Sequence, residues 1–347
     1  MAYSWSWSWG SESTALLQSD MGFAFSSTST AIIEPRTTEQ YKPTGAPTKY
    51  SMAFDLAAWV KIPLLVVEGL DQGVISTAVK NTGGGSYNTN YPPIQVQSVA
   101  STDIEIRLTG AGGVTLYIDN VFKSTSALAY DFSDWRFLAV HFDFRANPWK
   151  ARVTVDGVES NPEATDAAGA TTAAFALFRS PAGADRSWYN GNIIVQDTYA
   201  DVSTPRYVTR ISPDADVSTV GTWTPTSGSN FASTGVDPLV TATNTTEATP
   251  TIGDEVITGY TGDLTSLLGG IPASVSLVTV HSYSTGAANT ARAEVGDQAG
   301  ATTTAGATEL IGLGTTYAYA SAPVAPGDSA AWEGTDTPKA KYEVVSV

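Results

Sequence analysis

Residues 151–158 read ARVTVDGV, and this stretch decides the fold class. Val153 and Val155 alternate with polar neighbours, and this period of two predicts a half-buried β-strand. The Asp156-Gly157 pair that follows accepts two positive φ angles, so it predicts a tight turn into a second strand. We therefore expect an antiparallel β-hairpin at this point of the chain.

The same alternation extends outward from this hairpin. Residues 103–108 read DIEIRL and residues 114–118 read VTLYI, both bounded by turn-forming residues. Turn signals recur roughly every ten residues between 94 and 200, a spacing typical of a sandwich or jelly roll. We expect a single short helical turn within residues 262–268 and a long loop over the Ala/Thr-rich residues 161–174.

Composition and charge exclude several classes of protein. The chain has 347 residues, is 42% hydrophobic and carries a net charge of −16, so it is folded and repels nucleic acid and anionic membranes. The absence of cysteine removes disulfides and thiolate chemistry. No apolar run is long enough to cross a bilayer, and the first residues show no secretory signal.

Length and charge distribution predict two domains. Residues 201–347 hold 5 basic and 15 acidic residues, and this segment is dominated by Thr, Ala and Gly rather than by Trp and Phe. We place the boundary so that residues 1–205 form one domain and residues 206–347 form another.

Three segments carry a resemblance to a known fold. Residues 135–142 (WRFLAVHF), 151–157 and 191–197 (GNIIVQD) resemble the strand series of concanavalin A-like or laminin-G-like jelly rolls. The resemblance implies an all-β chain, with a concanavalin-like jelly-roll sandwich followed by a second, smaller β-sandwich.

A second resemblance concerns the start of the C-terminal domain. Residues 207–216 (YVTRISPDAD), followed by Trp223, resemble structural proteins of tailed-phage virions that carry such a jelly roll. This implies a virion location, as a tail-fibre, tail-tip or head-attached spike component. It also implies other virion proteins as partners and a homo-oligomer, with a trimer favoured.

The sequence predicts no catalytic residue. Glucanases related to the jelly roll place three acids on alternate positions of one strand, and the nearest match here is Asp103, Glu105 and Arg107. The third position is basic, and we expect Arg107 to pair with Glu105 instead of leaving a general acid. His141 and His281 are too separated for a triad, and His141 is expected on a strand face. We therefore predict a protein that is not an enzyme.

No metal or cofactor is predicted. Asp214, Asp216 and the Asp254-Glu255 pair offer oxygen ligands for Ca²⁺, which laminin-G-like domains often bind. Their spacing matches no Ca²⁺ loop, so we favour turn carboxylates over ligands.

An aromatic stripe lies at the N-terminus. Tyr3, Trp5, Trp7 and Trp9 alternate with serines, so an extended strand places all four rings on one face. Such a stripe is buried either in the chain's own sandwich or against a neighbouring subunit, and a glycan-stacking role is the lesser alternative. Subunit anchoring through these four residues is our prediction for the assembled protein.

Glycan-binding candidates lie in predicted loops. Residues 85–93 (GSYNTNYPP) supply the rings of Tyr87 and Tyr91 and the amides of Asn88 and Asn90, and Trp149 is expected at a loop tip. Rings that stack on sugars and amides that bind hydroxyls suit a glycan, although local packing is the alternative. The sequence thus predicts a virion structural protein, with a glycan-binding attachment module as the alternative and a glycoside hydrolase third.

Overall fold

The structure is a computed structural model that describes twenty-four segments of the chain: residues 4–8, 17–18, 22–26, 35–36, 41, 51–55, 58–64, 70–82, 92–99, 101–146, 148–166, 171–180, 187–199, 206, 208, 213–226, 228–230, 245–268, 275–283, 289–297, 303–311, 314–322, 325–326 and 329–346. The chain divides into two compact units, residues 1–43 with 48–208 (unit 1) and residues 44–47 with 209–347 (unit 2). Within the described residues, no helix is both long and apolar enough to cross a membrane.

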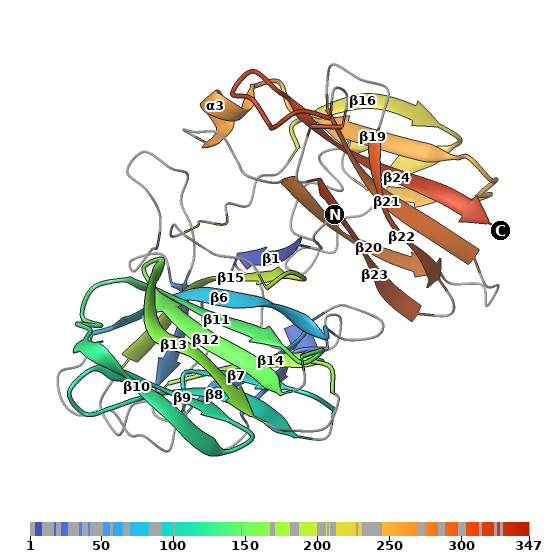
Figure 1. Cartoon of the computed structure of the whole chain (residues 1–347). Coiled ribbons are helices and arrows are strands. Elements are labelled where there is room, and N and C mark those ends of the chain that lie inside the picture. Colours follow the sequence, from blue (N-terminus) through green and yellow to red (C-terminus); the bar gives the residue numbers. More distant parts are fainter. Residues whose placement is uncertain are drawn as a thin grey trace. The chain divides into compact units, whose positions relative to one another are not determined.

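Sheet A forms one layer of unit 1 (Figure 1). β15 pairs with β6 along one edge. Along its other edge it pairs first with β4 and then with β1. In spatial order the strands are β13 (Val158–Asp166), β12 (Trp149–Val155), β11 (Arg136–Asp143), β6 (Gln72–Asn81), β15 (Ser187–Gln196), β4 (Ser51–Asp55) with β1 (Ser4–Ser8), and β3 (Pro35–Arg36).

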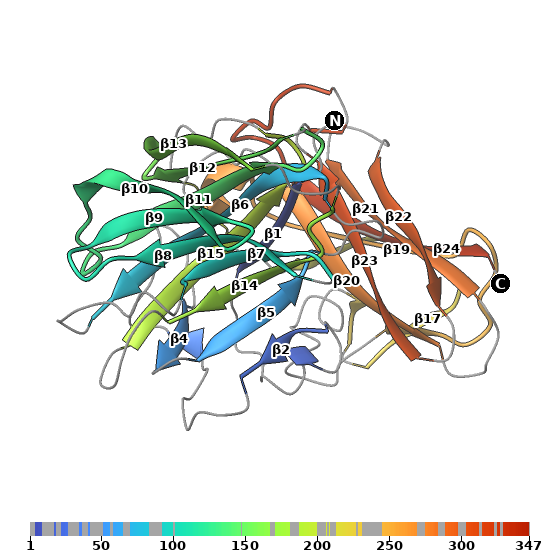
Figure 2. The same ribbon diagram turned by 60° about the horizontal axis from the view of Figure 1, so that its bottom comes forward.

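Sheet B forms the facing layer, and Figure 2 shows its strands following one another from β10 to β2. In spatial order they are β10 (Val121–Ala129), β9 (Gly113–Ile118), β8 (Thr102–Leu108), β7 (Ile94–Gln97), β14 (Phe175–Arg179), β5 (Trp59–Pro63) and β2 (Ala24–Phe25). Two stacked antiparallel sheets of this kind confirm the predicted jelly-roll-type sandwich.

The core lies between the two sheets, and alternation along β8 shows how it is built. Ile104, Ile106 and Leu108 are at most 1% exposed, whereas the residues between them point to the other face of sheet B. Each fully buried aliphatic side chain stabilises the fold by about 1.5–3 kcal/mol relative to exposure. The period of two therefore separates apolar from polar side chains, and the polar residues Asp103 and Glu105 on the other face are buried as well, at 2% and 6% exposed.

The hairpin turn predicted at Asp156-Gly157 is confirmed. Asp156 and Gly157 have φ angles of 53° and 81°, and they connect β12 to β13. The carboxylate of Asp156 also accepts hydrogen bonds from the backbone N–H of Phe137 (2.8 Å) and from Arg136 (2.8 Å). Asp119 and Asn120 have positive φ angles in the turn between β9 and β10.

The long loop predicted over residues 161–174 is wrong in its first part, because residues 161–166 continue β13. Asn161 is fully buried, and its side-chain amide donates to the carbonyl of Val114 and to the hydroxyl of Ser124, both at 3.1 Å. These hydrogen bonds to sheet B stabilise β13 in its register. The Ala/Thr-rich composition of this segment did not indicate a strand.

Unit 2 contains the second, smaller β-sandwich that the sequence predicted. Its five-stranded sheet C has the order β16 (Ala215–Val220), β19 (Glu255–Gly259), β24 (Pro338–Ser346), β21 (Asn289–Asp297) and β22 (Thr303–Ile311). Two further pairs are β20 (Val275–Tyr283) with β23 (Gly314–Ala322) and β17 (Trp223–Pro225) with β18 (Thr245–Glu247). The expected helical turn is α3 (Leu264–Leu268), whose Leu264 joins Ala293, Val295 and Trp332 in the core.

Candidate functional site

The outward face of sheet B, which we call the sheet B face, is the candidate site. Strand pairing places one residue from each of six strands side by side, so a continuous row crosses the sheet. Neighbouring strands are about 4.8 Å apart, so this row is about 24 Å long. Its members are Lys61, Leu177, Gln95, Glu105, Tyr117 and Phe122.

Aromatic rings and basic groups pair at both ends of the sheet B face. The ammonium of Lys61 lies 4.0 Å from the ring centroid of Phe175, and the guanidinium carbon of Arg107 lies 4.0 Å from that of Tyr117. Phe122 meets Tyr117 edge-on with the ring centroids 5.7 Å apart, and it is 54% exposed. Rings and cations therefore lie together at the two ends of the face, whereas Leu177, Gln95 and Glu105 between them are 5%, 8% and 6% exposed.

A hydrogen-bonded ladder of polar side chains lies in the middle of the face. Gln97 donates to Gln95 at 2.8 Å, and Gln95 donates to one oxygen of Glu105 at 2.9 Å. The other oxygen of Glu105 accepts from the Nε of Arg107 at 2.7 Å. The pairing of Arg107 with Glu105, predicted from the sequence, is confirmed, and the carboxylate is committed to neighbours within its own sheet.

Asp103 is also committed to local partners. It is 2% exposed and accepts hydrogen bonds from the hydroxyls of Ser101 (2.6 Å) and Ser98 (3.4 Å). Burial raises the pKa of this carboxyl, although the serine hydrogen bonds act in the opposite direction. Asp103 therefore anchors the turn between β7 and β8.

The outward face of sheet A is covered by the chain itself. Tyr41 packs in one cluster with outward residues of β6, β11 and β15, and Trp135 and Val208 lie against that cluster. A side chain at Gly191 would place its Cβ only 2.7 Å from the Cβ of Tyr41, so glycine is required there. Sheet A is consequently buried on both faces in this region.

His141 lies on β11, as expected of a strand-face histidine, and it is fully buried. Its Nε2 is 3.3 Å from the hydroxyl of Thr154, and its ring meets Tyr199 edge-on at 6.1 Å. The hydroxyl of Tyr199 donates to Glu163 at 2.8 Å, which lowers the pKa of Glu163. These contacts hold the segment after β15 against sheet A. His281 belongs to β20 in unit 2.

The predicted glycan-binding loop lies mostly outside the described residues, which include none of Tyr87, Asn88, Asn90 and Tyr91. Trp149 is not at a loop tip: it is the first residue of β12 and is 5% exposed. Its ring packs on Phe144 with the centroids 4.7 Å apart, so in this conformation no face of the indole is open to a sugar.

The N-terminal stripe enters unit 1 as a strand of sheet A. β1 places Trp5 opposite Val195 and Trp7 opposite Ile193, and both partners are fully buried. Tyr3 and Trp9 lie outside the described residues. Burial of the stripe in the chain's own sandwich and subunit anchoring both stay predictions.

The acids considered for Ca²⁺ bind neighbouring turn residues. Asp214 accepts from the N–H (2.7 Å) and hydroxyl (2.8 Å) of Thr261, and Asp254 accepts likewise from Thr251 (2.7 and 2.8 Å). Asp216 accepts from the N–H of Asn230 at 3.0 Å. In the described segments, no group of three His, Asp or Glu residues is arranged to hold a metal ion.

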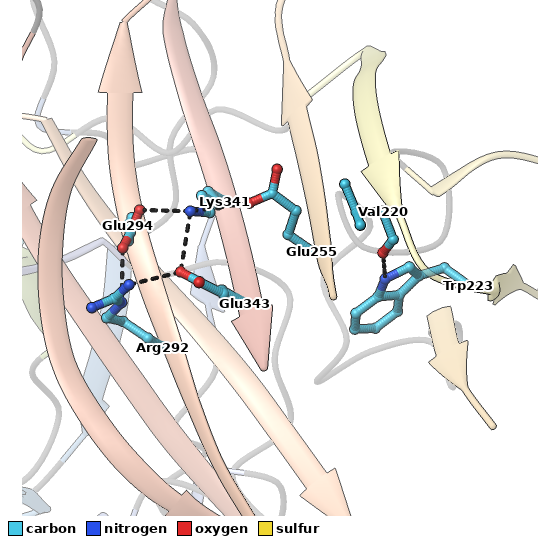
Figure 3. A network of polar contacts seen from close by, with 7 residues as sticks. All are labelled: Val220, Trp223, Glu255, Arg292, Glu294, Lys341 and Glu343. Atoms are coloured by element: carbon cyan, nitrogen blue, oxygen red, sulfur yellow. Dashed lines mark hydrogen bonds and ion pairs between the residues drawn. The ribbon is translucent and has the colours of Figure 1, made fainter. Parts of the chain in front are cut away.

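Sheet C carries a charge network that sequence reasoning missed (Figure 3). The ammonium of Lys341 lies 3.0 Å from Glu255, 3.3 Å from Glu294 and 3.1 Å from Glu343. Arg292 bridges Glu294 and Glu343 at 2.7 Å each. Burial acts to lower the pKa of Lys341, but the carboxylates outweigh it and raise that pKa to about 12.

Comparison with known proteins places the chain in no family. No protein-family model and no curated protein matches the sequence. Domain 4 of AbnA, a GH43 extracellular arabinanase from Geobacillus stearothermophilus, in complex with arabinotriose, is 14% identical; the match covers 52% of this chain and 86% of that chain, with a TM-score of 0.34.

Two other solved structures are similar at the same level. The Ca²⁺/Man-bound exoplasmic/lumenal domain of VIP36 is 10% identical, with 54% of this chain and 85% of that chain covered and a TM-score of 0.34. Trypanosoma rangeli sialidase in complex with the inhibitor DANA is 9% identical, with 45% of this chain covered and a TM-score of 0.34. The match spans only 27% of that sialidase and 18% of a second sialidase. Similarity of this degree carries no argument about function.

Proposed function

We propose that the chain is a structural, non-catalytic component of a tailed-phage virion, as part of a tail fibre, tail tip or head-attached spike. The resemblance of residues 207–216 and Trp223 to such proteins supports the virion location. In this proposal the chain works as a homo-oligomer, with a trimer favoured, in contact with other virion proteins.

The observation that carries the assembly role is a set of exposed apolar side chains on two edge strands. Val121 and Leu128 of β10 are 51% and 65% exposed, and Val158 of β13 is 66% exposed. β10 and β13 are the outer strands of sheets B and A, and the bond from Asn161 to Ser124 joins them. Large apolar side chains gathered on edge strands are typical of a protein contact surface.

Sedimentation of the full chain and protein analysis of purified particles test this proposal. We expect an oligomer in solution and the chain in the particles. The double substitution Leu128→Lys and Val158→Lys should weaken the oligomer, whereas Val217→Lys in unit 2, where Val217 is 45% exposed, serves as the matched control. A wild-type monomer that is absent from particles would refute the proposal.

A glycan-binding attachment module is the second candidate function. The specific observation that favours it is the sheet B face, where rings, amides and cations share one surface. The third candidate, a glycoside hydrolase, requires two carboxylates that flank the scissile bond, and on β8 the carboxylate of Glu105 is held by Arg107 and Gln95. Because the carboxylate of Glu105 is already hydrogen-bonded within its own sheet, it supports a binding role over a catalytic one.

A further inference from the structure

We infer that the sheet B face binds an acidic glycan, a polysaccharide with carboxylates on its sugar rings, laid across the strands from β5 to β10. The inference rests on the proposed attachment role and specifies its ligand. It differs from the loop site expected from the sequence, because its residues lie on strands.

The charge of the sheet B face opposes that of the whole chain. Its outward strand residues include three basic side chains and two acidic ones, a net charge of +1 on a chain with −16. These residues are Lys61, Arg107, Arg179, Asp103 and Glu105. At physiological salt, exposed charges more than about 8 Å apart are largely screened, so the side chains nearest to a ligand contribute most to its binding. A local excess of positive charge suits carboxylates on the ligand.

Lys61 is the cation best placed to meet such a ligand. It is half-buried on β5 and rests on the ring of Phe175, and within the described part of the chain it has no carboxylate partner. By contrast, Arg107 already shares its charge with Glu105. A carboxylate on a bound sugar would therefore give Lys61 its ion pair.

Aromatic surface is present at both ends of the row. Phe175 lies beside Lys61 at one end, and the exposed Phe122 leans on Tyr117 at the other. Between these ends, the ladder from Gln97 to Arg107 fixes the polar side chains in place before binding, so binding does not have to order them. The row is about 24 Å long and its accessible rings and cations lie at the two ends, so an extended polymer that reaches both ends fits it better than a compact small molecule.

Binding of the full-length chain to polygalacturonate, measured by calorimetry, tests the inference. Dextran is the neutral probe and dextran sulfate the sulfated one. We expect polygalacturonate to bind about ten-fold more tightly than dextran, and the affinity to fall as NaCl rises from about 50 to about 500 mM.

Matched variants locate the site. Lys61→Gln and Phe122→Ser should each weaken polygalacturonate binding about five-fold or more, the loss expected when an anchoring side chain is truncated. The controls are Lys150→Gln, at an exposed ion pair on sheet A, and Val158→Ser, at an exposed valine on β13. Both controls should bind as the wild type does.

Three results would overturn the inference: no binding of polygalacturonate, equal affinity for dextran or dextran sulfate, or equal losses in the control variants. Failure here is distinct from failure of the proposed function. A chain that is present in particles but binds no glycan refutes the glycan face alone, whereas a chain that binds polygalacturonate but is absent from particles refutes the virion role alone.

Discussion

Replacing Lys341 with methionine tests whether the charge network of sheet C stabilises unit 2. Methionine keeps an unbranched stem but removes the ammonium that contacts Glu255, Glu294 and Glu343. Glu294 and Glu343 then keep only Arg292, Glu255 loses the ion pair with Lys341, and the net charge of the cluster changes from −1 to −2. Because Glu294 is 3% exposed, water cannot solvate its carboxylate in place of the lost ammonium.

The burial of the partners sets the size of the effect. Breaking a fully buried ion pair costs about 3–5 kcal/mol, whereas an exposed pair is worth about 0–1 kcal/mol. The side chains of Lys341 and Glu294 are 16% and 4% exposed, which is near the buried limit, but Arg292 still compensates two of the carboxylates. We therefore expect a loss of about 2–3 kcal/mol, or about 6–9 °C in the midpoint of unit 2.

Differential scanning calorimetry of the full chain measures this change. Lys150→Met is the control, because the pair of Lys150 with Glu163 is about 40% exposed on both sides, and its loss should cost at most about 1 kcal/mol. A change of less than about 2 °C in the unit 2 midpoint of Lys341→Met would show that the network is a solvated set of surface charges, and the reasoning would fail.

The pH dependence follows from the same groups. Burial acts to raise the pKa of Glu343, but its bonds to Arg292 and Lys341 hold that pKa below the ordinary 4.5. A lowered folded-state pKa contributes stability that is present above pH 4.5 and is lost as the pH falls through the folded value. The stability advantage of the wild type over Lys341→Met should therefore shrink below about pH 4.5.

Three further predictions concern unit 1. Deleting residues 1–10 removes β1 from sheet A and should lower the thermal midpoint of unit 1; a truncated chain that melts normally but is lost from particles would assign the aromatic stripe to anchoring. Gly191→Ala should cost about 1–3 kcal/mol in urea unfolding because its Cβ meets Tyr41, and an unchanged midpoint would contradict that contact. Glu105→Gln should lower stability by about 1–2 kcal/mol through loss of the bond from Arg107 and leave polysaccharide turnover at background, whereas loss of a measurable cleavage activity would establish an enzyme.

Local sequence was sufficient to predict strands such as β8, β9 and β12, the hairpin turn at Asp156-Gly157 and one polar pair. The DIEIRL pattern places apolar and polar residues on opposite faces of β8, and two residues that are two apart on a strand share a face. The sequence alone therefore predicts that the side chains of Arg107 and Glu105 are neighbours. Likewise, Asp156-Gly157 carries its turn geometry in its own backbone preferences.

Strand order, by contrast, was beyond local pattern. Lys61 and Phe122 share one row only because β5, β14 and β7 are neighbours in sheet B, although they are far apart in sequence. The same holds for Lys341 and its three glutamates. Trp149 was misplaced because Asn147-Pro148 is a turn signal, and nothing in it shows that the indole then packs on Phe144.

The two sheets differ in a way that their sequences already contain, and this difference determines where a partner can bind. Residues 137–142 of β11 are buried on both faces, as expected of a near-continuous apolar run, and Tyr41, Trp135 and Val208 provide the outer cover. β8 instead alternates, so its outward side chains must find polar partners or a ligand. Sheet A is covered there by its own chain, and the centre of the sheet B face is buried at Leu177, Gln95 and Glu105. The ends of the sheet B face and the edge strands are therefore the surfaces that unit 1 offers among the residues described.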